Sequence, residues 1–334
     1  MQTKPKILIL TTGGTITMLR NEDGTLSPCR DVGALLERIP ELRQIADIDL
    51  LALANIDSSN LQPGLWKTVA TAIYERMDQY DGFVVTHGTD TIAYTSAALA
   101  FMIQELPKPI VVTGAQVPLG EIGNDGYVNL INAVRVATSD LAEVAVVFGS
   151  QIIYGTRAKK TSVFDLQAIV SVNEQPMGNI GLFIKFNATP MARNARKPLL
   201  QTSLNENVAR IAVYPGFKPD ILEYLAQAHD GIVLEGYGAG HIPTETNSLI
   251  PAIEAATARN VPVVVCTQCI VGSTQMEIYQ VGRAALEAGA IPALDMTSET
   301  AMVKLMWVMG QTKDMVTIHS KMQKPFAREI HPLS

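Results

Sequence analysis

The segment ILILTTGGTI, residues 7–16, is a short apolar run that ends in threonines and glycines. Such a run before a glycine-containing loop is typical of a buried strand in a parallel sheet. The pattern returns in three later segments, GFVVTHGTD (82–90), PIVVTGAQ (109–116) and VAVVFGSQ (144–151). Ligands of parallel sheets bind outside the carboxyl ends of the strands. We therefore expect the tips TTGGT, THGTD and TGAQ to converge at one edge of a sheet.

Segments with helical character lie between these strands, at residues 65–80, 91–106 and 129–140. The first shows apolar residues on one helix face, and the second is apolar nearly all round, as in a buried helix. Strands that alternate with helices indicate an α/β fold, with a mostly parallel sheet flanked by helices.

The chain has 334 residues, which is long for a single core, so two domains are expected. The strand–helix pattern stops at a polar stretch that contains Pro190 and Pro198, and it restarts with RIAVYPG. We predict a larger N-terminal catalytic α/β domain at 1–188, a linker at 189–209 and a smaller C-terminal α/β domain at 210–334.

The chain carries a formal net charge of -6 and has a pI of about 5.4. This charge provides no basic surface for nucleic acid or anionic lipid, so neither partner is expected. The apolar run ILIL near the start is too short for a signal peptide core or a membrane span. These features predict a cytoplasmic protein.

The three cysteines are too few, and odd in number, for a disulfide framework. Cys266 and Cys269 form a C-x-x-C pair after a strand-like run. A zinc site would need a second pair, so we predict no metal site and interpret Cys266 as a small buried apolar residue. Redox chemistry at the pair stays open as an alternative.

The glycines of the first tip do not match the common phosphate-binding motifs. The chain contains neither G-x-x-x-x-G-K-[ST] nor the serine hydrolase motif G-x-S-x-G. Gly13 and Gly14 are adjacent, whereas a dinucleotide site needs the spacing G-x-G-x-x-G. A generic anion site at a helix N-terminus stays open.

Hydroxyl chemistry is the other interpretation of these tips. A threonine hydroxyl becomes a nucleophile only when a base takes its proton. Thr89 is adjacent to Asp90, and a carboxylate can orient a lysine that, when desolvated, acts as the base. Lys159 and Lys160 follow a later strand. Threonine, aspartate and lysine on separate tips predict an amidase or acyl-transfer site without Ser–His–Asp.

Three further residues near the tips have simpler interpretations. His87 could be a general base, but a histidine in such a turn is more often a structural hydrogen bonder. We interpret Tyr154 as a packing residue and Arg157 as a surface charge.

Five motifs together resemble those of the bacterial-type L-asparaginases, in the order of that family: TGGTI (12–16), DSSN (57–60), HGTDT (87–91), VTGAQ (112–116) and DGYVNLINA (125–133). The similarity covers nearly the whole chain and is strongest to the cytoplasmic, type I branch. It implies hydrolysis of L-asparagine to L-aspartate and ammonia without a metal or organic cofactor. It also implies a homodimer or homotetramer.

The resemblance implies roles for four catalytic residues. Thr12 matches the threonine of a mobile loop, usually taken as the nucleophile, and Thr89 matches the second catalytic threonine. Asp90 matches the residue that binds the α-amino group of the substrate, and Lys160 matches the catalytic lysine.

The resemblance also implies a set of substrate-binding residues. Ser58 and Ser59, with Asp57 beside them, match the segment that holds the α-carboxylate. Ala115 matches the residue whose backbone lines the amide pocket. Sites of the family are completed by a neighbouring subunit, and we expect Glu277 in that role.

One family feature is absent from the sequence. The loop after TGGTI normally carries a tyrosine that helps to activate the first threonine, whereas Thr25 stands about where that tyrosine belongs. Two alternatives therefore stay open: a broader amide specificity that includes glutamine, and a non-catalytic amino-acid sensor. A third, the ammonia-donating subunit of a tRNA-linked amidotransferase, is disfavoured because we expect such a subunit to carry an additional N-terminal domain.

Overall fold

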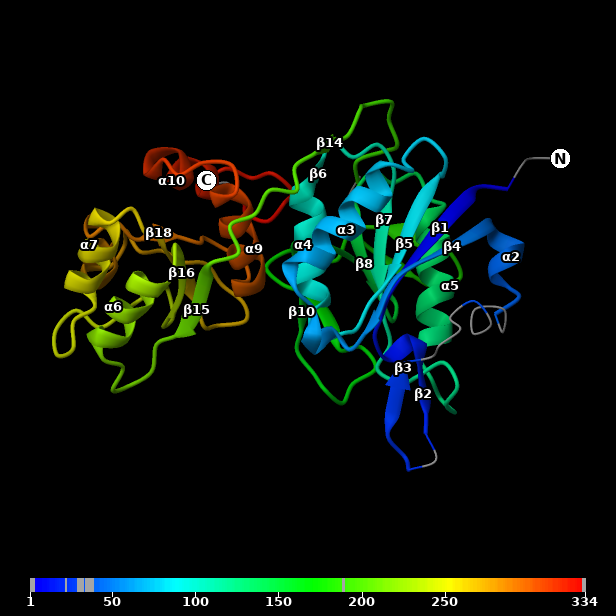
Figure 1. Cartoon of the computed structure of the whole chain (residues 1–334), viewed down its shortest axis with the longest axis horizontal. Coiled ribbons are helices and arrows are strands. Elements are labelled where there is room, and N and C mark those ends of the chain that lie inside the picture. Colours follow the sequence, from blue (N-terminus) through cyan, green and yellow to red (C-terminus); the bar gives the residue numbers. More distant parts are fainter. Residues whose placement is uncertain (1–3, 22, 29–32, 34–38, 188–189, 332–334) are drawn as a thin grey trace. The chain divides into compact units, whose positions relative to one another are not determined.

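The computed structural model of the chain describes residues 4–21, 23–28, 33, 39–187 and 190–331 (Figure 1). The chain divides into two compact units, Met1–Thr202 and Ser203–Ser334. Each unit has its own sheet and its own buried apolar core. The predicted fold class, a larger N-terminal and a smaller C-terminal α/β domain, is confirmed.

The main sheet of the first unit has eight strands in the order β13-β12-β9-β8-β7-β5-β1-β4. Five neighbouring strands are parallel: β4 (Asp47–Ile56), β1 (Lys6–Gly13), β5 (Gly82–Thr86), β7 (Ile110–Thr113) and β8 (Val144–Phe148). Three strands extend the sheet by antiparallel pairing: β9 (Gln151–Tyr154), β12 (Gly178–Ile180) and β13 (Ile184–Phe186).

Helices cover both faces of the parallel strands. Figure 1 shows α3 (Pro63–Tyr74) and α4 (Ile92–Met102) on one side, with α2 (Leu42–Ile45) and α5 (Gly126–Ala137) on the other. All residues of β5, β7 and β8 are buried, which explains their continuous apolar runs. Every residue of α4 except Tyr94 is buried, so its prediction as a buried helix is confirmed.

Strand β4 was not predicted from the sequence. It lies at the edge of the sheet, and its residues are exposed or only partly buried, so they lack a clear apolar pattern. It pairs in parallel with β1 from Lys6 to Thr11, and the register then shifts before Gly13 pairs with Ile56. This irregularity lies where the threonine-rich tip begins.

The second unit contains a parallel sheet of β15 (Val208–Ala212), β16 (Gly231–Gly236), β17 (Val263–Thr267) and β18 (Ile291–Pro292). Its helices are α6 (Pro219–Ala228), α7 (Ile250–Ala258), α8 (Gln280–Glu287), α9 (Ser298–Met309) and α10 (Met315–Gln323). Within the segment predicted as a linker, β14 (Leu199–Leu200) pairs with β6 (Ile103–Gln104) of the first unit. Cys266, on β17, is buried as predicted.

Each unit buries one tryptophan, Trp66 in α3 and Trp307 in α9. The second unit also buries an ion pair, in which Lys304 Nζ lies 2.6 Å from Glu329 Oε1. The Lys304 ammonium donates further to the carbonyl of Lys324 at 2.7 Å, and burial lowers its pKa. The pair fastens the C-terminal segment to α9.

No helix in the described ranges is long and apolar enough to cross a membrane.

Candidate active site

The tips of β1, β5 and β7 lie side by side at the carboxyl edge of the first sheet. The hydroxyl of Thr12 donates to the carbonyl of Thr86 at 2.9 Å, which joins the first tip to the second. The main-chain N–H of His87 donates to the carbonyl of Thr113 at 2.8 Å, which joins the second tip to the third. The predicted convergence of the three tips is confirmed.

Glycines permit these tips to approach each other through their backbones. Gly14 has a φ of 81°, and a Cβ on it would lie 2.3 Å from the nitrogen of Gly88. A Cβ on Gly88 would lie 2.5 Å from Ser58 Oγ, and one on Gly114 would lie 2.4 Å from the carbonyl oxygen of His87. The glycines therefore serve close backbone packing, and this explains their position without a bound phosphate.

Lys160 joins Thr89 and Asp90 in one hydrogen-bonded group. It ends β10 (Ala158–Lys160), which pairs with β11 (Ile169–Ser171). Its Nζ donates to Thr89 Oγ1 at 2.7 Å and to Asp90 Oδ1 at 2.7 Å. The Lys160 side chain is 19% exposed and that of Asp90 is 59% exposed, so the group opens to solvent on the carboxylate side.

Gln116, which was not predicted as a site residue from the sequence, completes the surroundings of Thr89. The hydroxyl of Thr89 donates to Gln116 Oε1 at 2.9 Å. Thr89 Oγ1 therefore accepts from Lys160 and donates to Gln116 at the same time. The signal in the sequence was that Gln116 ends the motif VTGAQ, directly after Ala115.

The motif DGYVNLINA holds the third tip in place. The carboxylate of Asp125 accepts from the main-chain N–H of Gln116 at 3.0 Å and of Val117 at 2.9 Å. Asn129 donates from Nδ2 to the carbonyl of Gly114 at 3.0 Å and to Asp125 at 3.1 Å. Ala115 is fully buried, and these bonds hold the main chain of Gly114 before it and of Gln116 after it.

The DSSN segment forms a short 3-10 helix, η2 (Ser58–Asn60), beside the second tip. Asp57 caps it: Oδ1 accepts from the Ser59 hydroxyl at 2.6 Å and from its N–H at 2.8 Å. These bonds, with the hydroxyl contributing most, lower the pKa of Asp57. The carbonyl of Ser58 accepts from Thr91 Oγ1 at 3.0 Å, so the segment is bound to HGTDT.

Thr25 does not offer a substitute for the missing tyrosine hydroxyl. It lies in the turn between β2 (Met18–Arg20) and β3 (Leu26–Pro28). Its hydroxyl donates to Asp23 Oδ1 at 2.6 Å and accepts from Asn21 Nδ2 at 2.9 Å. The hydroxyl is thus engaged within its own turn.

His87 is a structural residue in this geometry. It is fully buried, with Nδ1 2.8 Å from the carbonyl oxygen of Gly88 and Nε2 2.8 Å from Thr95 Oγ1. A carbonyl only accepts, so Nδ1 carries the proton and Nε2 accepts from Thr95, whose oxygen accepts from Trp66 Nε1 at 2.9 Å. Burial lowers the pKa of His87 to about 4, and both ring nitrogens are occupied.

The interpretation of Arg157 as a surface charge is wrong, because the residue is fully buried. It lies in the tight turn between β9 and β10, where its N–H donates to the carbonyl of Tyr154. Its own carbonyl accepts from the N–H of Val172, directly after β11, so this strand covers the turn. Tyr154 is buried, as expected for a packing residue.

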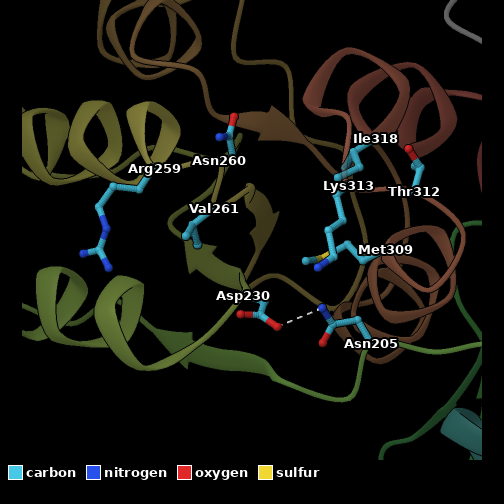
Figure 2. A pocket seen from close by; sticks show the side chains of 9 residues that line it. All are labelled: Asn205, Asp230, Arg259, Asn260, Val261, Met309, Thr312, Lys313 and Ile318. Atoms are coloured by element: carbon cyan, nitrogen blue, oxygen red, sulfur yellow. Dashed lines mark hydrogen bonds between the residues drawn. The ribbon is translucent and has the colours of Figure 1, made fainter.

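A surface hollow of about 300 Å³ lies in the second unit (Figure 2). Asn205, Asp230 and Val261 line it, and each stands shortly before one of the strands β15, β16 and β17. The hollow is therefore at the amino ends of these strands, away from the edge where parallel sheets bind ligands. Across the described ranges, no group of three or more His, Cys, Asp or Glu side chains is arranged to hold a metal ion.

Two solved structures of bacterial proteins resemble the chain over nearly its full length. L-asparaginase I from Vibrio cholerae has a TM-score of 0.90 and 30% identity, over 98% of this chain and 100% of that one. A probable cytoplasmic L-asparaginase from Campylobacter jejuni has a TM-score of 0.82 and 28% identity, over 96% and 100%.

Two archaeal relatives are more similar in sequence. An L-asparaginase from Thermococcus kodakarensis is 40% identical over 97% of this chain and 99% of its own length. The solved structure of the thermostable L-asparaginase from that organism gives a TM-score of 0.91, over 98% of this chain and 100% of that one. A glutamyl-tRNA(Gln) amidotransferase subunit from Pyrococcus horikoshii is 37% identical over 98% of this chain and 77% of its own length.

Family descriptions match both units. Residues 6–192 match the family described as "Asparaginase, N-terminal", and residues 207–322 match "Glutaminase/Asparaginase C-terminal domain". The N-terminal match contains every strand tip of the site, and the relatives align over nearly the whole chain. The chain therefore belongs to the asparaginase family.

Proposed function

We propose that the chain is an amidohydrolase that converts L-asparagine to L-aspartate and ammonia through a threonine acyl-enzyme. The observation that carries the proposal is the group formed by Thr89, Lys160 and Asp90, with two contacts of 2.7 Å from the lysine. The 40% identity to an L-asparaginase over almost the full chain supports the same reaction.

The chemistry follows from these contacts. A threonine oxygen attacks the amide carbon, and the hydroxyl proton passes to Lys160 in its neutral form, which Asp90 orients. Lys160 returns the proton to the leaving nitrogen, so that ammonia departs and an aspartyl ester stays on the threonine. Water then attacks the ester, which releases aspartate and restores the hydroxyl.

We assign the attack to Thr12, whose proton passes to Lys160, and an orienting role to Thr89. In the structure the hydroxyl of Thr12 donates to the carbonyl of Thr86, which is not a base. Attack by Thr12 therefore requires this hydroxyl to rotate away from Thr86 when substrate binds. This movement is a rotation of the Thr12 side chain, so it does not require the closely packed backbone of Gly13 and Gly14 to move.

Substrate recognition is assigned to the remaining residues of the site. The exposed carboxylate of Asp90 suits the α-ammonium group, and the cap of Asp57, Ser58 and Ser59 suits the α-carboxylate. The backbone at Ala115 suits the amide end of the substrate, since Asp125 holds the residue after it.

The test is ammonia release from L-Asn and L-Gln by the purified wild type and by Thr12→Ala, Thr89→Ala and Thr25→Ala. We expect a preference for Asn, and a loss of about 10³-fold or more in kcat for the first two variants. Thr25→Ala is the matched control and should stay within a few-fold of wild type.

Two results would contradict the proposal. One is the absence of ammonia at any Asn concentration; tight Asn binding by calorimetry would then identify an amino-acid sensor. The other is a Thr89→Ala variant with normal kcat. Peptide mapping of an acid-quenched reaction would locate the aspartyl ester and test the assignment of Thr12.

A second candidate function is ammonia donation from a different amide. The 37% identity to a glutamyl-tRNA(Gln) amidotransferase subunit favours it. A higher kcat/KM for L-Gln than for L-Asn would select this candidate.

We further propose that the protein belongs to the bacterial-type, type I branch, is cytoplasmic and forms a homodimer or homotetramer. The similarity to L-asparaginase I from Vibrio cholerae supports the branch. Apolar side chains near the site support an oligomer: Val163 and Phe164, in the loop after Lys160, are each 90% exposed. Glu277 is also exposed, as a residue that completes a neighbouring site must be.

A further inference from the structure

The carboxamide of Gln116 is a polar group beside the reactive hydroxyls that the proposed reaction does not yet use. We propose that Gln116 is a positioning residue, whose side-chain oxygen holds the proton of Thr89 and so fixes the direction of the Thr89 hydroxyl. This inference rests on the proposed amidohydrolase function. It concerns how the site is pre-organised, and it adds no new chemical step.

The donors and acceptors around Thr89 leave a single arrangement. Lys160 Nζ donates to Thr89 Oγ1 and to Asp90 Oδ1 at 2.7 Å each, so the oxygen of Thr89 accepts from it. The neutral amine that the reaction uses keeps two N–H donors for these contacts and has its lone pair free. The one hydroxyl proton of Thr89 then points to Gln116, 2.9 Å away, which requires the carboxamide to present its oxygen. Two directions of the Thr89 oxygen are thereby occupied, and a single lone pair is left to face a substrate or a water molecule.

The main chain of Gln116 is fixed independently of its side chain. Asp125 accepts from the N–H of Gln116 and of Val117, and Asn129 holds Asp125 from the next turn of α5. The carboxamide therefore reaches Thr89 from an anchored backbone. Pre-organised groups of this kind lower the activation free energy, because the entropy of orienting the reacting groups is lost before the reaction begins.

A purely structural role fits the carboxamide less well. Across the described residues, the side chain of Gln116 makes one hydrogen bond, and its partner is Thr89 of the site. Gln104 shows a structural pattern instead: its Nε2 donates to the carbonyls of Ala100 and Phe101 at the end of α4. Gln104 therefore provides a matched control for the same substitution outside the site.

The test compares kcat and KM for L-Asn in wild type, Gln116→Met, Gln116→Glu and Gln104→Met. Methionine keeps the length of the side chain and removes the acceptor, so kcat should fall about tenfold with KM within about twofold. Glutamate keeps an acceptor oxygen at the same reach, so on the high-pH plateau of its profile it should recover part of the lost kcat. Gln104→Met should keep the wild-type kcat.

The dependence of kcat on pH provides a second readout, because a change in packing alone would not shift its midpoint. The charged groups around the carboxamide are Lys160 and Asp90 beside Thr89, and Asp125 behind the main chain. A new carboxylate in Gln116→Glu favours the ammonium form of Lys160, so the rise of kcat with pH should shift to higher pH. Gln116→Met adds no charge and should keep the wild-type midpoint.

Three outcomes would overturn the inference: a kcat of Gln116→Met within twofold of wild type, equal losses for Met and Glu on the high-pH plateau, or an unshifted profile for Glu. If Gln116→Met does not fold, Gln116→Asn, which withdraws the acceptor by one methylene, should lower kcat with little change in KM. Failure of the proposed function is a separate result, because it appears as an inactive wild type.

Discussion

His87 illustrates, at the scale of a single residue, how burial fixes a protonation state beside a reactive centre. Its Nδ1–H holds the carbonyl of Gly88, the residue before Thr89, and its Nε2 accepts from Thr95. A protonated imidazole would have to donate from both nitrogens inside the apolar core. The neutral ring is therefore part of the folded structure.

The low pKa of His87 predicts a dependence of stability on pH. The folded-state pKa of about 4 lies below the ordinary value of 6.5, so between these values the unfolded chain binds a proton that the folded chain does not. Stability is complete above about pH 6.5 and should fall by roughly 3 kcal/mol as the pH drops to 4.

Urea denaturation at pH 7 and pH 4.5 checks this expectation. The non-titrating variant His87→Gln should lose clearly less stability between the two pH values than wild type does. Equal losses would mean that carboxylates such as Asp49 and Asp57, whose pKa values are lowered by hydrogen bonds, account for the whole effect.

At the scale of elements, the site depends on how closely three strand ends approach each other. The end of β1, after its shift in register, and the tip of β5 bring Gly14 against Gly88 with no space for a side chain. Gly24, in the β2–β3 turn, has a similar φ of 84° but no atom within 4 Å of a built Cβ. A substitution at Gly24 therefore tests the free-energy cost of a positive φ alone, whereas one at Gly14 tests that cost together with a steric clash.

Gly14→Ala and Gly24→Ala should therefore differ in their free energy of unfolding. Gly24→Ala should lose about 1 kcal/mol, because a positive φ is unfavourable for alanine. Gly14→Ala should lose about 2 kcal/mol more, since backbone has to move, and its kcat should fall as well. Denaturant titrations and ammonia assays on both variants measure this; similar losses would refute the role of the contact.

The sequence predicted the elements whose residues are uniformly buried and was less informative at exposed edges. Strands β1, β5, β7 and β8 appear as continuous apolar runs because helices cover both faces of the sheet. Strand β4 has one neighbour and mixed exposure, so its pattern is weak.

The candidate site was predictable where residue chemistry is distinctive. Thr89, Asp90 and Lys160 were selected for nucleophile, acid and base chemistry, and the structure brings them together. Gln116 was missed because an uncharged amide carries no reactive signature. Arg157 was misplaced because the sequence shows its charge but not the strand that covers its turn.

At the scale of the whole molecule, the two units have separate sheets and cores. Such units are expected to respond to mutation individually. The buried pair of Lys304 and Glu329 belongs to the second unit alone, and removal of one partner leaves a buried charge uncompensated. Trp66 and Trp307 report on the first and second units respectively.

Lys304→Met should lower the stability of the second unit by about 3–5 kcal/mol. Fluorescence of Trp307, in a Trp66→Phe background, should show this loss, whereas Trp66 in a Trp307→Phe background should report a smaller shift. The double variant Lys304→Met/Glu329→Leu should recover part of the stability, since no isolated charge is left but the N–H groups of Phe326 and Ala327 lose their acceptor. Equal shifts at both tryptophans would show that the two units unfold as one.

The contacts of Gly14, Gly88 and Gly114 limit which codons can accept missense mutations, in nature and in directed evolution. Every missense change in a glycine codon adds a Cβ, and at these three positions that atom would overlap a neighbouring loop. Changes in substrate preference are therefore expected at other codons. Libraries that aim to change the preferred amide should keep these three codons fixed and randomise Gln116, which follows the proposed amide-binding backbone of Ala115 and whose main chain is held by Asp125.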